Sequence, residues 1–185
     1  ALHTPAGVLT TRSDPEGRRT VYDLLAGRDE WIAPVGRLDR DSSGLLLFSN
    51  DAAWAARVTR PGAAAPKTYI VRVRGGLVDA QLARLREGVT LADGPARAHR
   101  LRVLAASAKR TVLEMVLHEG RNRQIRRMIA EVGSKVLSLQ RTAIGALTLE
   151  GLPPGAWRAL ADGEVDALAE RGMARPEPPK QDGRA

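Results

Sequence analysis

The pattern of hydrophobic and polar positions predicts a sheet of several short strands. In residues 67–74 apolar and polar positions alternate, so Tyr69, Val71 and Val73 would share one face of a strand. The largely apolar run 45–49 is short enough to be a buried strand. Residues 2–11 are predicted to be a short extended segment interrupted by Pro5 and Gly7, and further strands are predicted for residues 98–104, 111–117, 135–141 and 147–149.

Apolar residues at helical spacing predict helices between these strands. The clearest helix covers residues 122–132, where Ile125, Met128 and Ile129 form one stripe and Gly133 follows the last turn. Because helices and strands are mixed without regular strand–helix–strand alternation, we expect an α+β fold with a mixed sheet. Shorter helices are predicted for 20–27, 52–58, 79–88 and 162–168, with N-caps at Thr20, Asn50 or Asp51, Asp79 and Asp162.

The chain of 185 residues is long enough for one compact domain with a substantial core, which we expect over residues 1–170. Proline and charged residues dominate from Arg171, so residues 171–185 are predicted to be a disordered tail. No stretch approaches the length of a membrane span, and no secretory signal opens the sequence. Since the first residue is Ala1 rather than Met, further residues can precede it.

The charge balance favours a polyanionic partner. Twenty-nine Lys and Arg residues face 21 Asp and Glu residues, which gives a formal charge of +8 and a pI near 10.9. Nucleic acid is the simplest partner for such an excess. The absence of cysteine excludes disulfides and thiolate metal sites, and His3, His99 and His118 are scattered, so we expect no metal. Few aromatic residues argue against a broad base-stacking surface.

One polar stretch precedes the buried strand. Gly36 and Gly44 enclose two carboxylates, two arginines and two serines. A loop held by a buried strand can present a reactive carboxylate such as Asp39. The alternative is an ordinary turn, in which Asp and Ser side chains satisfy backbone donors.

A second cluster contains four arginines between Gly120 and Met128. Arg123, Arg126 and Arg127 fall at helical spacing, so they can share one surface that binds phosphates. The alternative is a solvated basic helix face. The fourth, Arg121, precedes the helix, a position that suits contact with a neighbouring loop.

Three motifs together resemble the RsuA-like pseudouridine synthases. They are Gly36-Arg37-Leu38-Asp39 followed by Ser43-Gly44-Leu45-Leu46, the pair Lys67-x-Tyr69, and residues 119–128, Glu-Gly-Arg-Asn-Arg-Gln-Ile-Arg-Arg-Met. Their order and spacing match the family over nearly residues 1–170, which would then form the catalytic domain. Within the family, residues 40–44 and the turn 59–62 are most similar to members that modify large-subunit ribosomal RNA.

The resemblance implies a mixed, largely antiparallel sheet flanked by helices, with a central active-site cleft. It implies an isomerase that converts a specific uridine to pseudouridine in ribosomal RNA, in particular the 23S RNA of the large subunit. The substrate would be the ribosomal RNA itself or a ribosomal precursor particle. The reaction moves a glycosidic bond from nitrogen to carbon without redox change, so no cofactor is expected. We further expect a cytoplasmic monomer without a membrane partner. The small N-terminal S4 RNA-binding domain of many members is not visible in the sequence.

The resemblance also implies roles for individual residues. Asp39 matches the catalytic aspartate, Tyr69 the tyrosine that packs on the target base and helps move a proton, and Arg121 the arginine that pairs with the aspartate. Leu139 matches an apolar residue of the uracil pocket. The basic residues expected to contact RNA are Arg37, Arg40, Lys67, Arg123, Arg126, Arg127 and Arg141.

One position departs from the family. Its opening motif has a lysine where this chain has Thr4, which removes a cation near the expected site. This departure leaves a second hypothesis, a non-catalytic RNA-binding or ribosome-assembly factor that keeps the fold. A weaker third hypothesis is a hydrolase that uses Asp39 and Asp41 as a carboxylate pair. Pseudouridine mapping separates the first two hypotheses, and assays for free base or cleaved RNA test the third.

Overall fold

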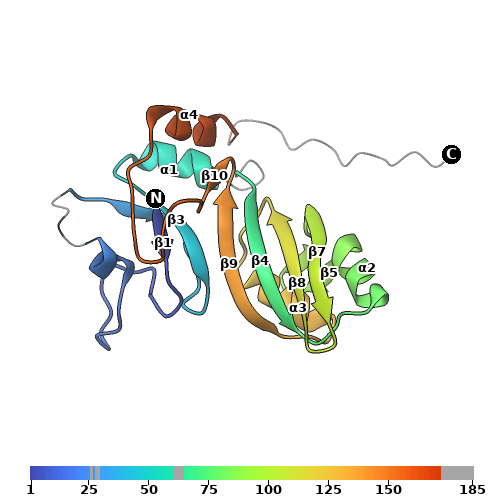
Figure 1. The fold of residues 1–185 in the computed structure, drawn as a ribbon. Helices are drawn as coiled ribbons and strands as arrows, with labels where there is room; N and C mark the ends of the chain where they lie inside the picture. The colour runs from blue at the N-terminus through green and yellow to red at the C-terminus, as the bar shows by residue number, and fades with distance from the viewer. Residues whose placement is uncertain (26, 28–29, 61–64, 172–185) are drawn as a thin grey trace.

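The computed structural model describes residues 1–25, 27, 30–60 and 65–171. An eight-stranded sheet runs through both halves of the molecule in the order β1-β3-β9-β4-β8-β7, with β10 beside β9 and β2 beside β3 (Figure 1). The only parallel pair among these strands is β3 with β9. The expected mixed, largely antiparallel sheet is therefore confirmed.

The strands follow the predicted segments, with three additions. The structure adds β2, β5 and β6, each too short to show a clear alternation. The strands are β1 (Leu2–Thr4), β2 (Ala33–Val35), β3 (Ser43–Ser49), β4 (Lys67–Arg74), β5 (Val89–Leu91), β6 (Gly94–Ala96), β7 (Arg100–Ser107), β8 (Arg110–Leu117), β9 (Val136–Ile144) and β10 (Leu147–Thr148). β5 and β6 form a separate two-stranded hairpin.

The helices also lie where apolar spacing predicted them. They are the 3₁₀ helix η1 (Val21–Leu24) and the α-helices α1 (Ala52–Thr59), α2 (Asp79–Glu87), α3 (Gln124–Glu131) and α4 (Asp162–Arg171). Arg171 is thus helical, and the rest of the predicted tail, 172–185, lies outside the described residues.

Two of the predicted caps have different outcomes. Asp51 caps α1, since its Oδ1 accepts a 2.9 Å hydrogen bond from the Trp54 amide. Asp79 does not cap α2, because that helix begins one residue earlier than expected. Val78 is the N-cap, and its amide donates to the Gln81 side chain at 3.0 Å. A helix can thus close its first turn with a side chain from inside it.

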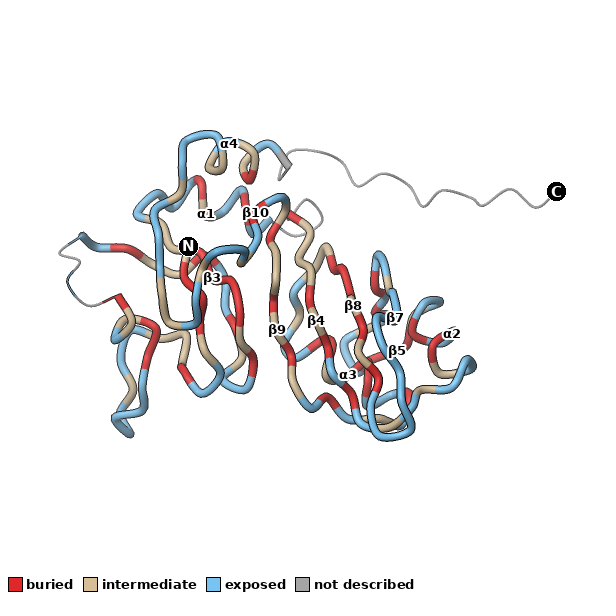
Figure 2. Tube along the Cα trace, in the orientation of Figure 1, coloured by how far each residue is buried: buried red, intermediate tan, exposed pale blue. Residues whose placement is uncertain are grey.

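The largest hydrophobic core lies on one face of strands β9, β4, β8 and β7, the right half of the sheet in Figure 1. Val71 and Leu113, from β4 and β8, face Leu85 of α2 and Met128 of α3. The other half is built around β3. Its Leu45 and Leu47 pack under α1 and α4, whereas Leu46 packs with β1 and η1 on the opposite face. The predicted burial of this strand is therefore confirmed, and Figure 2 shows its buried centre.

The two halves join closely at Gly44. This residue has φ +116° and lies beside Arg141 in the parallel pairing of β3 with β9. A Cβ at this position would overlap the backbone of Arg141. Glycine is required here both for its φ and for the close approach of two backbones, and the junction brings the loop before β3 against β9.

Candidate active site

A cleft of about 690 Å³ lies between the two halves. The loop 35–42 and part of α1 line one side, and β4, β9 and the loop 117–125 line the other. Asp39, Tyr69 and Leu139, which come from three separate segments of the sequence, all contribute to its wall. The expected central cleft is present and contains them.

Asp39 lies in the loop between β2 and β3, and local hydrogen bonds hold it there. Its carbonyl accepts a 2.9 Å bond from the Ser42 amide. Just before it, buried Leu38 exchanges backbone hydrogen bonds with the Thr10 hydroxyl at 3.1 and 3.3 Å. The turn predicted as the alternative is thus present, and it serves as the support for a carboxylate that stays about a quarter exposed.

The arginine beside Asp39 is Arg123. Its Nη1 lies 3.9 Å from Oδ2 of Asp39, and the guanidinium makes two 3.0 Å hydrogen bonds to the Asp41 carboxylate. Arg123 has φ +47° and is the one non-glycine residue with positive φ in the described part of the chain. Left-handed backbone is unfavourable for arginine and is typical of functional sites. The backbone just before α3 is therefore shaped to place this guanidinium.

Asp41 joins the two sides of the cleft. Burial raises its pKa, but the hydrogen bonds from Arg123 and the charges of Arg126 and Arg123 outweigh burial and hold the pKa below its usual value. Arg126 also donates to the Asp41 carbonyl at 2.7 Å and to the Ser42 hydroxyl at 3.2 Å. Asp41 is thus the counter-ion of two arginines rather than the partner of Asp39 in a carboxylate pair.

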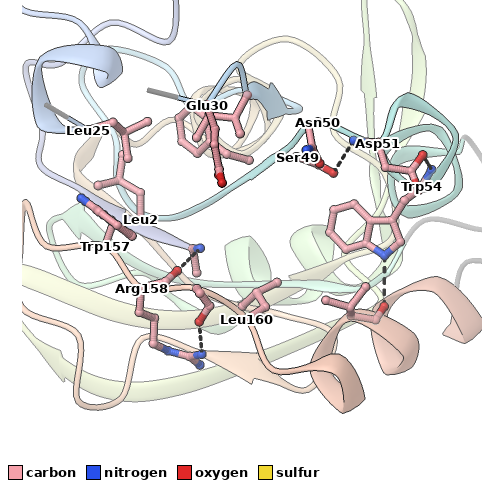
Figure 3. Close-up of a pocket in the computed structure, with 15 residues that line it drawn as sticks. Leu2, Leu25, Glu30, Ser49, Asn50, Asp51, Trp54, Trp157, Arg158 and Leu160 are labelled. Atoms are coloured by element: carbon pink, nitrogen blue, oxygen red, sulfur yellow. Dashed lines mark hydrogen bonds between the residues drawn. The ribbon is translucent and has the colours of Figure 1, made fainter. Parts of the chain in front are cut away.

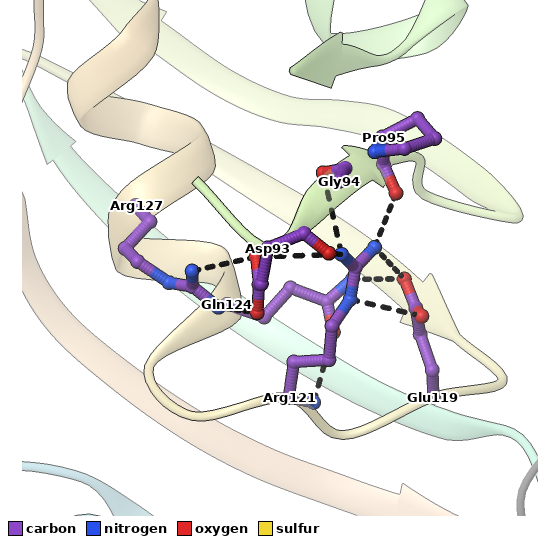
Figure 4. Close-up of polar contacts among 7 residues, drawn as sticks. All are labelled: Asp93, Gly94, Pro95, Glu119, Arg121, Gln124 and Arg127. Carbon is purple, nitrogen blue, oxygen red and sulfur yellow. Dashed lines mark hydrogen bonds and ion pairs between the residues drawn. The ribbon is translucent and has the colours of Figure 1, made fainter. Parts of the chain in front are cut away.

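The expected pairing of Arg121 with Asp39 is wrong. The Arg121 guanidinium turns away and binds Glu119 at 2.9 and 3.1 Å (Figure 4). It also donates to the carbonyls of Asp93, Gly94 and Pro95 in the β5–β6 hairpin. The sequence did not show this hairpin, whose carbonyls attract the guanidinium.

Arg127 is held by the same hairpin. It makes a bidentate pair with Asp93 at 2.8 and 2.9 Å, and these bonds and charges lower the pKa of that carboxyl (Figure 4). Arg123, Arg126 and Arg127 therefore do not form one shared phosphate-binding surface. Arg127 turns toward the hairpin, whereas the other two turn toward Asp41. Asp93 and Glu119 are site carboxylates to which sequence reasoning assigned no role, and it considered Asp41 only as half of a carboxylate pair.

The cleft has an apolar floor next to a buried cation. Tyr69 and Leu139 are 8% and 7% exposed on neighbouring strands, in line with a pocket for a flat ring. Arg141 is 3% exposed, and its Nε donates to the Leu45 carbonyl at 2.7 Å. Its Nη2 is buried and has no hydrogen-bond partner among the described residues. Arg141 therefore ties β9 to β3 and adds positive charge beneath the cleft.

A second cation, the partly buried Lys67, lines the same cleft. Burial and the nearby charge of Arg141 lower its pKa to about 8. His118 also lines the cleft and lies edge-on to His99, with 4.4 Å between ring centroids. Burial, His99 and Lys67 together lower the pKa of His118. Sequence reasoning placed no role on His118, because a lone histidine gives no spacing signal.

The comparison with known families is decisive. A family model described as RNA pseudouridylate synthase matches residues 1–131, most of the chain. The chain belongs to this family. The resemblance seen in the sequence is confirmed, and the protein is a pseudouridine synthase, an isomerase that converts uridine to pseudouridine in RNA.

Two relatives and one solved structure agree with this assignment. Ribosomal large subunit pseudouridine synthase B of Bacillus subtilis is 36% identical over 92% of this chain and 72% of its own length. Ribosomal large subunit pseudouridine synthase E of Vibrio vulnificus is 37% identical over 86% of this chain and 74% of its own. A crystal structure of a pseudouridylate synthase superposes with TM-score 0.79 at 30% identity, over 90% of this chain and 71% of that one.

Three further positions of this pseudouridine synthase, singled out from the sequence, lie in different surroundings. Arg37 is exposed and lines the cleft, whereas Arg40 is exposed but does not line it. Thr4, where the family has lysine, is fully buried on β1 opposite Gly44, and its hydroxyl lacks a hydrogen-bond partner among the described residues. The substitution therefore places a small neutral side chain inside the sheet.

A second pocket, of about 330 Å³, lies between the N-terminal strand, α1 and α4 (Figure 3). None of the predicted site residues lines it. Over the described ranges, no group of three His, Asp or Glu side chains could hold a metal ion. No helix in those ranges is long and apolar enough to cross a membrane.

Proposed function

We propose that this pseudouridine synthase isomerises a uridine of large-subunit ribosomal RNA, the 23S RNA of bacteria. The main observation in support is that Asp39, Arg123 and Tyr69 line one cleft between the two halves of the sheet. The substrate class rests on the two relatives named for the large ribosomal subunit. The basic chain supports it, because a net positive charge favours binding to RNA.

Asp39 would be the nucleophile. In the reaction the bond between N1 of uracil and C1′ of ribose breaks, the ring turns, C5 bonds to C1′, and the proton of C5 leaves while N1 gains one. A carboxylate in the cleft can attack C1′ or C6, or remove a ribose proton on a glycal route. Arg123, rather than Arg121, would hold that carboxylate in its reactive orientation.

The floor of the cleft would receive the base. A uridine must leave its stack before it reaches Asp39, so the pocket has to replace stacking. Tyr69 would pack on the flipped ring and help move a proton, and Leu139 would close the pocket beside it. Lys67 and the exposed Arg37 would meet the negative backbone at the mouth.

The proposal includes the protein's setting. We propose that it acts as a cytoplasmic monomer on ribosomal RNA or on a precursor of the ribosomal particle. The supporting observation is that one chain supplies every group placed in the cleft. Sedimentation of the purified protein at micromolar concentration tests the monomer.

The test of the function is a map of pseudouridine in large-subunit RNA. Chemical mapping compares cells with the gene, cells without it, and cells that carry Asp39→Asn. We expect one modified position to disappear in the second and third strains, while the variant still binds RNA. A map that is unchanged by deletion would contradict the proposal, and a position restored by Asp39→Asn would remove Asp39 from the chemistry.

A further inference from the structure

In the part of the sheet formed by β4, β8 and β7, one face carries no helix of the described residues. Strands β4 and β8 present Val71 and Leu113 to α2 and α3 on the covered face. Figure 1 views the opposite, open face, where no helix of the described residues lies over β4, β8 or β7. Along each strand, residues that point to this open face alternate with the core residues of the covered face. Those on the open face include Ile70, Arg72, Arg74, Arg100, Arg102, Arg110, Val112 and Glu114.

The five arginines of this set, Arg72, Arg74, Arg100, Arg102 and Arg110, form what we call the open arginine face. All five are exposed. Arg100 and Arg102 share one carboxylate, Glu114, at 3.4 and 3.6 Å. No carboxylate of the described residues pairs with the other three. The face therefore keeps a net positive charge that the protein itself does not neutralise.

Two of the unpaired arginines repel each other. Arg74 lies directly opposite Arg110 in the antiparallel pairing of β4 with β8. Like charges at directly opposed positions destabilise a sheet, because their Cβ atoms are only about 5 Å apart. Arg72 lies two residues before Arg74 on the same face, at about 7 Å along the strand. An external anion placed across these positions would relieve the repulsion.

We propose that the open arginine face binds the phosphate backbone of an RNA helix. Guanidinium groups make bidentate hydrogen bonds to phosphate, and RNA helices are recognised chiefly through their backbone. The face contains no aromatic side chain, so it cannot hold unstacked bases as a single-strand platform would. A helical, sequence-independent partner fits this composition.

This inference rests on the proposed function for the identity of the polymer. Tyr69 on β4 and Leu139 on the neighbouring β9 face the cleft from the opposite side of the sheet. The helix on the open arginine face is therefore not the segment that carries the target uridine. It is a second part of a folded RNA, and contact with it increases affinity for large substrates without changing the chemical step.

The test uses an RNA duplex that the catalytic cleft cannot process. The probe is a uridine-free duplex of about 16 G·C pairs, the span that a small RNA-binding domain covers on a helix. The test variant is Arg72→Gln with Arg74→Gln and Arg110→Gln. The control variant removes the same charge elsewhere, at three other exposed arginines, Arg19, Arg84 and Arg86. Binding is measured over a range of salt concentrations.

At a salt concentration of about 0.1 M, we expect the test variant to bind the duplex about 10-fold more weakly than the wild type, with a salt slope lower by about 2. The control variant should retain most of the affinity and the slope. Duplex binding equal to that of the wild type, or an equal loss in both variants, overturns the proposal. A wild-type dimer that only the test variant dissociates also overturns it, because the face would then bind a second copy.

Failure of this inference is distinguishable from failure of the proposed function. The duplex contains no uridine, so its binding does not depend on isomerisation, and Asp39→Asn should bind it like the wild type. The pseudouridine map reports the chemistry independently. On a long ribosomal RNA fragment the test variant should raise KM several-fold and leave kcat unchanged. A changed kcat would contradict a role limited to binding.

Discussion

The two loops that meet at the cleft are held in different ways. The loop that carries Asp39 contains a turn of its own, closed by the bond from the Ser42 amide to the Asp39 carbonyl, and Thr10 supports it from a separate segment. The loop that carries Arg123 is held by groups that are distant in sequence. Arg123 binds Asp41, 82 positions away, and Arg121 in the same loop binds Asp93, 28 positions away. A site can thus combine a nucleophile in a loop that has its own turn with an arginine whose side chain is placed by distant segments.

The difference explains why the nucleophile was easier to predict than its partner. Local chemistry left Asp39 as a candidate beside the alternative of an ordinary turn, and the family resemblance implied its catalytic role. Four arginines in a short segment are equivalent by composition, and only the hairpin and Asp41 determine which one faces the nucleophile.

The largest effect should separate Arg123 from Arg121. We expect Arg123→Gln to reduce kcat by roughly 10²–10³-fold, the usual cost of losing one charged donor beside a reacting group. Arg121→Gln should cost clearly less, because its guanidinium binds the hairpin. Single-turnover pseudouridine formation on ribosomal RNA measures both, with Arg84→Gln as the control. A larger loss in Arg121→Gln would restore Arg121 as the partner of Asp39.

The junction of the two halves can be disrupted at Gly44. We expect Gly44→Ala to destabilise the fold by roughly 3 kcal/mol or more, because the new Cβ meets the backbone of Arg141 at a positive φ. Gly7 has a comparable φ of +95° but open space around it. Gly7→Ala should therefore cost only the backbone strain, about 1–2 kcal/mol. Urea unfolding compares the two, and equal losses would show that close packing at Gly44 is unimportant.

The cleft cation should give a moderate pH effect. Burial lowers the pKa of Lys67 to about 8, so the side chain is charged below that pH and loses its charge as the pH rises through it. We expect the KM for RNA to rise several-fold between about pH 7 and 9. Lys67→Arg, which stays charged, should remove that step. If the KM of Lys67→Arg rose by the same factor over this pH range, the titrating group would be a residue other than Lys67.

The smallest effect should come from the hairpin. Asp93→Asn removes the counter-charge of Arg127 and part of the Arg121 contact. We expect a small fall in Tm and a modest fall in kcat, because Arg121 keeps its bonds to Glu119 and Gly94 and Arg127 can be hydrated by solvent. If the hairpin positions the arginine loop, combining Asp93→Asn with Arg121→Gln should reduce kcat by less than the product of the single effects. Fully multiplicative effects would show that the two residues act independently.

Most of the architecture could be predicted from the sequence. Alternation gave β4 over its full length, and helical spacing with Gly133 gave α3 to within two residues. Short elements were missed, because three residues of β5 or β6 carry no periodic signal. Asp79 was mistaken for a cap because an acidic first-turn residue and an N-cap have similar sequence signatures.

From the sequence alone, the family resemblance predicted that Asp39, Tyr69 and Leu139 belong to one site, and the structure places all three in one cleft. Periodicity predicted the elements that carry them. Those elements depend on local periodicity and on turn chemistry that neighbouring residues supply. Only the tertiary structure decided which arginine accompanies Asp39, that Arg121 binds the β5–β6 hairpin, and that one face of the sheet is left open and basic. Each of these depends on which carboxylates and carbonyls distant segments bring within hydrogen-bond distance, and ion pairs of long side chains have no fixed spacing along the chain.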